Sequence, residues 1–339
     1  MDNFTNTLEY NVSHYLAVFE KGTGNFSDMG TNTRNSTRVG NDPTIMVLRC
    51  LVLVLYLLTF VFGVVGNSLT ILVILRNKRM KTVATCFILN LAVADDLFML
   101  SLPFMAYSTY AQNWIFGSLL CTLMSSVHKI NFYASIFTMV LMSIDRYLAI
   151  VHPLSSIRYR TVRNAVWVCV GIWAACCVII MPFWLYARTG SPRPNYTICT
   201  VYWPRNSILE HKWFWANFEL LVGFVVPIII MVLCYLKLLK HLITENVPCH
   251  DQTRRPIRKV TVMVFIVTIV FVICWTPYHI VEYTNVQKVH AFVGRQMRPS
   301  RDEIVTHAIF NTVAQALVFL SSCCNPFIYS ISSRNFSEY

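Results

Sequence analysis

The sequence predicts an all-α membrane protein, a bundle of seven transmembrane helices. Of its 339 residues, 55% are hydrophobic and only 13% are charged, whereas about a quarter of the residues of a soluble domain are charged. Seven charge-poor segments exceed both the roughly 20 residues of a membrane-spanning helix and the ~10 residues of a barrel strand. Because every backbone polar group must be hydrogen-bonded inside lipid, we expect helices. The expected spans are Ile45–Leu75, Val83–Tyr110, Ser118–Val151, Asn164–Ala187, Trp213–His241, Ile257–Val286 and Glu303–Ile331.

The distribution of basic residues predicts the orientation. The loop at 76–82 holds four basic residues, and the loop at 111–117 holds no Lys or Arg. Since short loops rich in Lys and Arg stay in the cytoplasm, we expect the N-terminus outside and the C-terminus inside. The expected division is a flexible, glycosylated extracellular tail (1–44), a transmembrane domain (45–331) and a short cytoplasmic tail (332–339). No leader peptide is recognised, so the first span is expected to serve as the targeting signal.

The formal net charge of +12 comes from Lys and Arg residues that flank the apolar spans. This placement fits membrane topology and contact with anionic membrane lipid, and it does not form the basic patch that binds nucleic acid. We therefore expect membrane lipid and not nucleic acid as a partner.

Asn-X-Ser/Thr sequons lie on the proposed outer side, four of them in a tail rich in Asn, Thr, Ser and Gly. Such a composition is typical of a flexible, glycosylated extracellular segment. A further sequon at Asn335 falls on the inner side and is expected to stay unused. The expected glycosylation sites are Asn3, Asn11, Asn25, Asn35 and Asn195.

Two of the twelve cysteines are expected to form a disulfide. Only Cys121, at the outer start of the third span, and Cys199, in the second outer loop, face the oxidising side. The others lie inside spans or in a cytoplasmic loop, where a small buried apolar group is the simplest interpretation. The bond would hold the loop across the mouth of the bundle and contribute roughly 2–4 kcal/mol.

Ionisable side chains inside a bilayer are costly, so they are candidates for function. Intervals of three and four residues put His128, Asn131 and Ser135 on one face of the third span, which we expect to point inward. The ionisable candidates are Asp95, Asp96, His128, Lys129, Asp145, Arg146, Glu219 and Glu282.

Each span also carries a short motif around a polar, aromatic or proline residue. The motifs are Gly66-Asn67, Leu91-Ala92-Val93-Ala94-Asp95, Asp145-Arg146-Tyr147, Trp173, Pro227 with Tyr235, Cys274-Trp275-Thr276-Pro277 and Asn325-Pro326-Phe327-Ile328-Tyr329. One motif is weak, but the ordered set on seven spans resembles the rhodopsin-like (class A) G-protein-coupled receptors from about residue 45 to 331. Residues 87–91, 143–153 and 259–261 resemble the somatostatin, opioid and insect allatostatin-C peptide receptors.

The resemblance implies a sodium ion in the resting state, held by an oxygen-rich cluster in the bundle. The alternative is a water-filled polar cluster without an ion, and no other metal or cofactor is expected. The residues of this cluster are Asp95, Asn131, Ser135, Ser321 and Asn325.

The resemblance also implies that the inner face binds a heterotrimeric G protein, with the inhibitory class favoured. Asp145 is expected to hold Arg146 at rest, and outward movement of the sixth helix, kinked at Pro277, to release it. A static bend at Pro277 is the alternative. Relatives often carry an acid at the positions of Ile257 and Arg258, where it pairs with the third-helix arginine, whereas Thr261 is the nearer candidate partner of Arg146 here. Since a hydroxyl restrains a guanidinium less than a carboxylate does, we expect appreciable basal signalling. The activation residues are Asp145, Arg146, Tyr147, Tyr235, Thr261, Pro277, Asn325, Pro326 and Tyr329.

The ligand class follows mostly by exclusion. The seventh span has no Lys for a retinal Schiff base, and His128 stands where amine, opioid and somatostatin-like members carry an Asp. We expect an extracellular peptide, with an acidic residue or free C-terminus favoured by the basic outer loops. Glu219 and Glu282 leave a basic ligand group open, and His128 could instead bond neighbouring helices. The ligand-binding candidates are His128, Asn131, Tyr107, Trp275, Tyr278, His279, Glu282 and Glu219.

Several alternatives are weighed against a peptide receptor. A chemokine- or lipid-type receptor of the same fold is the second choice. An ion-coupled transporter would need paired repeats, and a zinc hydrolase would need a His-Glu-X-X-His pattern, neither of which is found, so no enzyme is expected. Only ten residues follow Tyr329, which leaves arrestin binding open.

Overall fold

The computed structural model describes residues 43–77, 81–193, 196–204, 208–244, 254–295 and 301–332. Seven helical segments within these ranges are long and apolar enough to cross a membrane. This confirms the predicted all-α seven-helix bundle. The predicted glycosylation sites Asn3, Asn11, Asn25, Asn35 and Asn195 lie outside the described residues.

Within the described ranges, the elements are helices and one β-hairpin. In order, they are α2 (Pro43–Arg76), α3 (Val83–Met99), α4 (Leu102–Ala111), α5 (Gly117–Val151), α6 (Pro153–Ser156), α7 (Val162–Ile179), α8 (Met181–Tyr186), β1 (Ala187–Arg193), β2 (Tyr196–Val201), α9 (Ile208–Leu220), the π-helical turn η5 (Leu221–Val225), α10 (Val226–Thr244), α11 (Arg254–Arg295) and α12 (Arg301–Ser332).

Two spans that the sequence predicted as continuous are interrupted. The second span consists of α3 and α4, and the fourth consists of α7 and α8. Pro103 and Pro182 lie in the first turn of α4 and α8, where a proline has no helical hydrogen bond to lose. The hydrogen-bonding pattern therefore breaks just before each proline. At the end of α4, Gln112 adopts a left-handed backbone conformation with φ of 53°.

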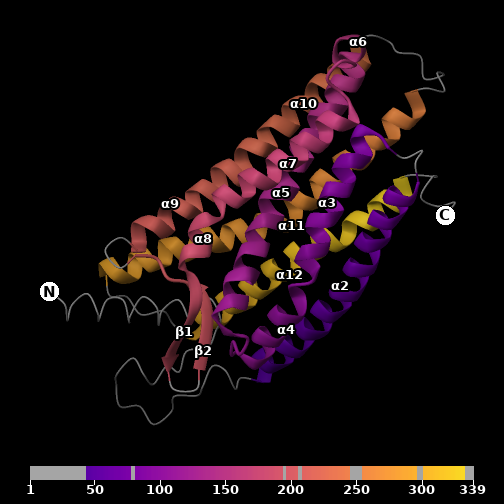
Figure 1. Ribbon diagram of the computed structural model, residues 1–339. Coiled ribbons are helices and arrows are strands. Elements are labelled where there is room, and N and C mark those ends of the chain that lie inside the picture. The colour runs from indigo at the N-terminus through magenta and orange to yellow at the C-terminus, as the bar shows by residue number, and fades with distance from the viewer. Residues whose placement is uncertain are drawn as a thin grey trace.

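The helices form an elongated bundle (Figure 1). The antiparallel hairpin β1–β2 lies at one end, called here the hairpin end, and α6 lies at the other, called here the α6 end. Helix α5 contacts α3, α7, α10 and α11, so it lies at the centre of the bundle. One continuous helix therefore links the two ends.

Large side chains divide between the bundle interior and its outer surface. Tyr133 and Trp275 are fully buried between helices, whereas Leu69, Val178 and Leu233 are exposed. Exposed apolar side chains on helices of this length fit contact with lipid.

Candidate functional site

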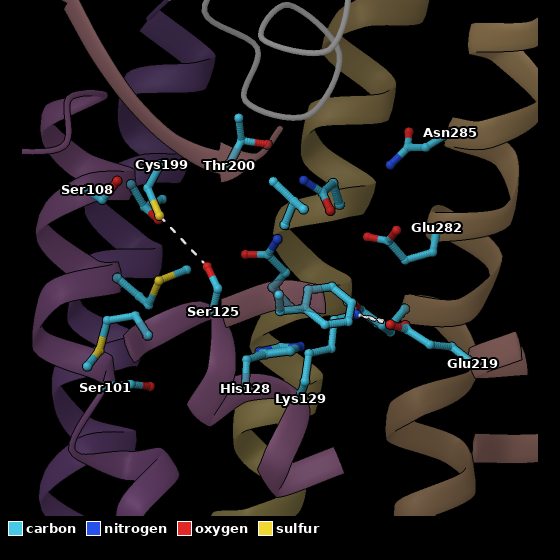
Figure 2. A pocket seen from close by; sticks show the side chains of 18 of the residues that line it. Ser101, Ser108, Ser125, His128, Lys129, Cys199, Thr200, Glu219, Glu282 and Asn285 are labelled. Carbon is cyan, nitrogen blue, oxygen red and sulfur yellow. Dashed lines mark hydrogen bonds and ion pairs between the residues drawn. The ribbon is translucent and has the colours of Figure 1, made fainter. Parts of the chain in front are cut away.

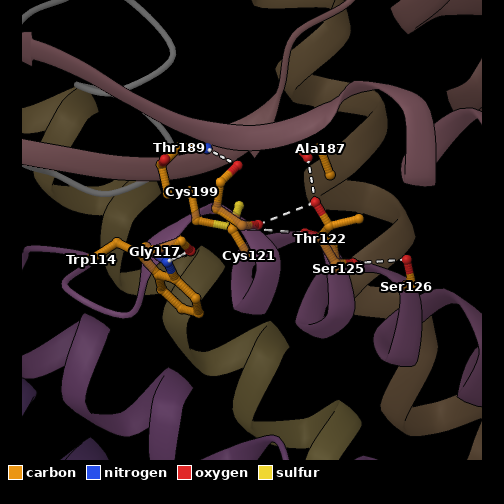
Figure 3. Close-up of a disulfide and its surroundings, with 10 residues drawn as sticks. Trp114, Gly117, Cys121, Thr122, Ser125, Ser126, Ala187, Thr189 and Cys199 are labelled. Atoms are coloured by element: carbon orange, nitrogen blue, oxygen red, sulfur yellow. Dashed lines mark hydrogen bonds between the residues drawn. A yellow bond between two sulfur atoms is a disulfide. The ribbon is translucent and has the colours of Figure 1, made fainter.

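The hairpin is fastened over the end of the bundle by a disulfide and by hydrogen bonds. Cys121 of α5 and Cys199 of β2 form the predicted disulfide (Figure 3). The Thr122 hydroxyl donates to the carbonyl of Ala187 at 2.6 Å, and the Trp114 amide donates to the carbonyl of Thr197 at 2.9 Å. Both strands are therefore tied to the first turns of α5 and to the loop before it.

A cavity of about 330 Å³ lies directly beneath β2. Helix α5 contributes His128 and Lys129 to its wall, α9 contributes Glu219, and α11 contributes Tyr278 and Glu282. Its volume is at the small end of the range of ligand pockets. The cavity thus has room for a small part of a large ligand, and its charged groups come from three different helices.

An ion pair crosses the floor of this cavity (Figure 2). The Nζ atom of Lys129 lies 2.5 Å and 2.7 Å from the two carboxylate oxygens of Glu219, and it donates to the Tyr278 hydroxyl at 3.2 Å. It also lies 5.2 Å from the ring centroid of Phe183, within cation–π range. The exposed fractions of the Lys129 and Glu219 side chains are only 14% and 6%. The pair therefore joins α5 to α9 in a largely dry setting.

This pair was not predicted from the sequence. Lys129 is one of the ionisable residues of the predicted spans, but only the neighbouring face with His128, Asn131 and Ser135 carries a repeated polar pattern. Opposite charges within two apolar spans are expected to find each other, since an unpaired charge in the membrane is costly. That signal was sufficient to pair Lys129 with one of the two glutamates.

The remaining predicted ligand residues occupy different depths. His128, Glu219, Tyr278 and Glu282 line the cavity, whereas Trp275 lies below it, with its ring centroid 6.0 Å from that of His128. The structure does not place the other three candidates in the lining. Tyr107 lies at a half-exposed site beside Phe116, His279 lies in an aromatic cluster, and Asn131 belongs to the Asp95 cluster.

Aromatic side chains connect the cavity floor to the middle of the bundle. The Trp275 ring packs 4.6 Å from Phe132 and 5.3 Å from Phe271, measured between centroids. Phe132 leaves no space at Gly223 of η5, where a Cβ atom would lie 2.4 Å from the Phe132 ring. Trp275, Phe132 and the π-helical turn are therefore packed one against the next.

The predicted polar cluster lies below this aromatic layer. Asp95 accepts hydrogen bonds from Asn131 at 3.1 Å and from Asn325 at 2.7 Å. Ser135 and Ser321 are buried as well. Within the described ranges, the Ser135 hydroxyl and the Asn131 carbonyl oxygen have no hydrogen-bond partner. The cluster therefore combines a carboxylate with unused oxygens, which is the type of donor set that binds a hard cation.

The predicted activation residues gather toward the α6 end. Arg146 forms an ion pair with Asp145, and Arg160 donates to the same carboxylate at 2.7 Å. The hydroxyl of Ser143 donates to that of Tyr235 at 3.2 Å. Asp145 thus holds two guanidinium groups, one more than the sequence analysis assigned to it.

Other predicted activation residues lie on the neighbouring helices. Tyr147 exchanges a hydrogen bond with His152 at 3.1 Å, and Thr261 and Tyr329 are buried. The prolines 277 and 326 lie inside α11 and α12. A Cβ atom at Gly66 would lie 3.0 Å from the Pro326 ring, so α2 and α12 approach each other closely there.

The chain is similar to proteins of a known receptor family. The sequence profile of the 7 transmembrane receptor (rhodopsin family) matches residues 66–329. Somatostatin receptor type 2 of Sus scrofa is 36% identical over 285 residues, which cover 84% of this chain and 74% of that protein. Somatostatin receptor type 1 of Rattus norvegicus is 33% identical over 320 residues, which cover 94% of this chain and 77% of that protein. Somatostatin receptor type 5 of Bos taurus is 37% identical over 309 residues, which cover 91% of this chain and 80% of that protein. The chain belongs to the rhodopsin family (class A) of G-protein-coupled receptors, which are multi-pass proteins of the plasma membrane and not enzymes.

Proposed function

We propose that this receptor binds an extracellular peptide of the somatostatin or allatostatin-C type and signals through inhibitory G proteins. The hairpin end then faces the outside and the α6 end faces the cytoplasm. The similarity to somatostatin receptors of types 1, 2 and 5 supports the ligand class. The location of the Cys121–Cys199 disulfide supports this orientation, since disulfides persist on the oxidising side of the membrane.

The observation that carries the proposal is a charged cavity connected by packed side chains to the α6 end. His128 and Lys129 line the cavity, and Arg146 lies 18 residues along the same helix, or about 27 Å. Contacts made by a ligand at the cavity floor reach Trp275 through His128. Movement of α11 at Pro277 would then change the packing around Arg146.

We further propose that the Asp95 cluster binds a sodium ion in the resting receptor. The carboxylate and the unused oxygens of Asn131 and Ser135 support this assignment. Agonist affinity should fall as sodium rises, and Asp95→Asn should remove that dependence. An agonist affinity in the unaltered receptor that does not respond to sodium would overturn the sodium site.

Cells that express the full chain provide the test of ligand class and coupling. Cyclic disulfide-bonded peptides of the somatostatin and allatostatin-C types, a chemokine panel and a lipid panel are applied while cyclic AMP is recorded. We expect a peptide to lower stimulated cyclic AMP at nanomolar concentration, and blockade of inhibitory G proteins with pertussis toxin to abolish the effect.

Arg146→Ala provides the control, because it leaves the cavity intact and removes the side chain that Asp145 holds. This variant should bind the peptide without lowering cyclic AMP. A response only to chemokines or lipids would contradict the peptide assignment. A peptide response insensitive to the toxin would contradict inhibitory coupling alone.

A further inference from the structure

We propose that the outer edge of β2, at Cys199 and Val201, binds an extended segment of the peptide ligand as a third strand of the hairpin. This inference rests on the proposed peptide ligand and specifies how the receptor recognises its main chain. The recognised chemistry is a row of backbone N–H and C=O groups, whatever the charge of the ligand side chains. Three extended residues, about 10 Å long, cover this edge.

The first step is that the hydrogen-bond pattern of the hairpin directs the backbone groups of Cys199 and Val201 away from β1. In an antiparallel pair of strands, hydrogen-bonded residue pairs alternate with pairs whose N–H and C=O groups point outward. The Tyr202 amide donates to the carbonyl of Tyr186 at 2.8 Å, and the next pair in the register is Ala187 with Val201. Val201 therefore belongs to the outward-pointing class, and so does Cys199, two residues before it.

Contacts on the β1 edge confirm this assignment. The carbonyl of Ala187 accepts from the Thr122 hydroxyl at 2.6 Å, and the Thr189 amide donates to the Ser118 hydroxyl at 3.5 Å. Ala187 and Thr189 are the register partners of the two β2 residues, and their backbone groups point away from β2 toward α5. The outward edge of β1 is thus covered by α5.

The second step is that the receptor itself uses the β2 edge at one position only among the described residues. At Thr197, the amide donates to the Asn113 side chain at 2.8 Å and the carbonyl accepts from the Trp114 amide at 2.9 Å. Within the described ranges, no hydrogen bond reaches the outward backbone groups of Cys199 and Val201. The loop before α5 therefore pairs with the edge once, and two amides and two carbonyls follow it.

The third step is that this part of the edge faces the cavity. Consecutive residues of a strand point to opposite faces of a sheet, so a cavity that met one face would be lined by alternate residues. Cys199, Thr200 and Val201 all line the cavity, and all three are partly exposed. The strand therefore meets the cavity with its edge. An edge of this kind is a template for another strand, and peptide ligands are bound by such strand addition.

The wall across the cavity offers a partner for the second edge of the bound segment. A ligand strand paired with β2 has a further row of N–H and C=O groups, which also need partners when buried. Asn285 of α11 lines the cavity and is 7% exposed. Among the described residues, its side-chain oxygen has no hydrogen-bond partner. Figure 2 shows Asn285 and Cys199 on different sides of the cavity, so Asn285 is placed to accept from a ligand amide.

The receptor-side test removes the outward amide of Val201. Val201→Pro deletes an N–H group that the hairpin does not use, and proline is tolerated at such edge positions. Val201→Ala keeps the amide and reports the effect of the side chain. Thr189→Pro is the matched control, because it deletes an outward amide from the β1 edge, outside the cavity lining.

Binding is measured on purified full-length receptor with the panel peptide of the somatostatin or allatostatin-C type that lowers cyclic AMP. Val201→Pro should bind this peptide at least about 10-fold more weakly than Val201→Ala, since a ligand carbonyl then has no donor. Thr189→Pro should stay within about 3-fold of the unaltered receptor.

The ligand-side test replaces one amide of the panel peptide at a time by an ester, which removes the N–H group without adding bulk. Alternate residues of a strand present their N–H groups to the same edge. Consecutive positions should therefore alternate between a loss of about 10-fold and little change. A hydrogen bond inside the cyclic peptide would also cost affinity, so the scan is repeated on Val201→Pro. Losses at the sensitive positions should shrink there, whereas an internal bond would cost the same in both receptors.

Four results would overturn the inference. They are binding by Val201→Pro within about 3-fold of Val201→Ala, an equal loss in Thr189→Pro, an ester scan without alternation, and identical scans on both receptors. If Val201→Pro does not fold, the alternation on the unaltered receptor decides. The peptide assignment stands in each case, because the panel peptide still binds. If no panel peptide binds the unaltered receptor, the inference and the peptide assignment fail together.

Discussion

Substitution of Lys129 by Met should destabilise the ligand-free receptor, because it leaves the buried Glu219 carboxylate without its cation. Met retains most of the aliphatic stem and removes the ammonium group that contacts both oxygens of Glu219. Breaking a buried ion pair by removing one partner costs about 3–5 kcal/mol. Because the Lys129 side chain is 14% exposed to the cavity, water relieves part of the penalty, and we expect about 3 kcal/mol.

The reciprocal change is expected to cost less. In Glu219→Leu, the ammonium group keeps the Tyr278 hydroxyl and the Phe183 ring, and Glu282 lies in the same cavity. We expect about 2 kcal/mol. The double variant removes both charges together and should cost about 2 kcal/mol, so the coupling energy of the pair is about 3 kcal/mol.

Unfolding by SDS titration in mixed micelles, followed by circular dichroism, measures these differences. Lys240→Met on the exposed surface of α10 is the matched control and should change stability by no more than about 0.5 kcal/mol. Additive costs of the two single substitutions, within about 0.5 kcal/mol, would refute the account of a coupled buried pair.

Three further predictions follow from packing, covalent linkage and the α6 end. Gly223→Ala puts a Cβ atom 2.4 Å from the ring of Phe132 and should lower stability by about 1–3 kcal/mol; Gly171→Ala in α7, with open space around it, should stabilise by a few tenths to about 1 kcal/mol, and the opposite order in thermal melts would contradict the packing argument. Cys121→Ser opens a linkage that spans 78 residues and should cost about 2–4 kcal/mol, measured by unfolding with and without reductant, which should affect only the unaltered receptor. Thr261→Lys, which adds a positive charge on α11, a helix that packs against the Arg146 helix α5, should raise ligand-free inhibition of cyclic AMP, and equal basal activity in both receptors would count against a restraining role for Thr261.

The sequence predicted the helices well because lipid imposes a simple rule on them. A segment that must satisfy its own backbone hydrogen bonds over ~30 Å has few alternatives to a helix. The breaks before Pro103 and Pro182 were missed because apolar composition continues through them, although each proline was a usable signal. The hairpin was missed because its strands, Ala187–Arg193 and Tyr196–Val201, are short and lack a regular alternation of apolar residues.

The site was predictable in part. The pairing of Cys121 with Cys199 followed from which cysteines face the oxidising side, and the Asp95 cluster was implied by the resemblance to class A receptors. Which acidic residue pairs with Lys129 depends on how α9 is rotated about its own axis. The π-helical turn η5, which lies before Pro227, shifts the helical register there. No spacing rule in one sequence predicts such a turn.

The central claim is that occupancy of the cavity beneath the hairpin is coupled to G-protein binding at the α6 end. The most direct measurement is GDP release from a purified heterotrimer by purified full-length receptor, with and without a peptide that stabilises it. The account predicts that the peptide accelerates GDP release and that Arg146→Ala abolishes the acceleration while the peptide still binds. A peptide that binds and leaves the rate of GDP release unchanged for every heterotrimer class would contradict it.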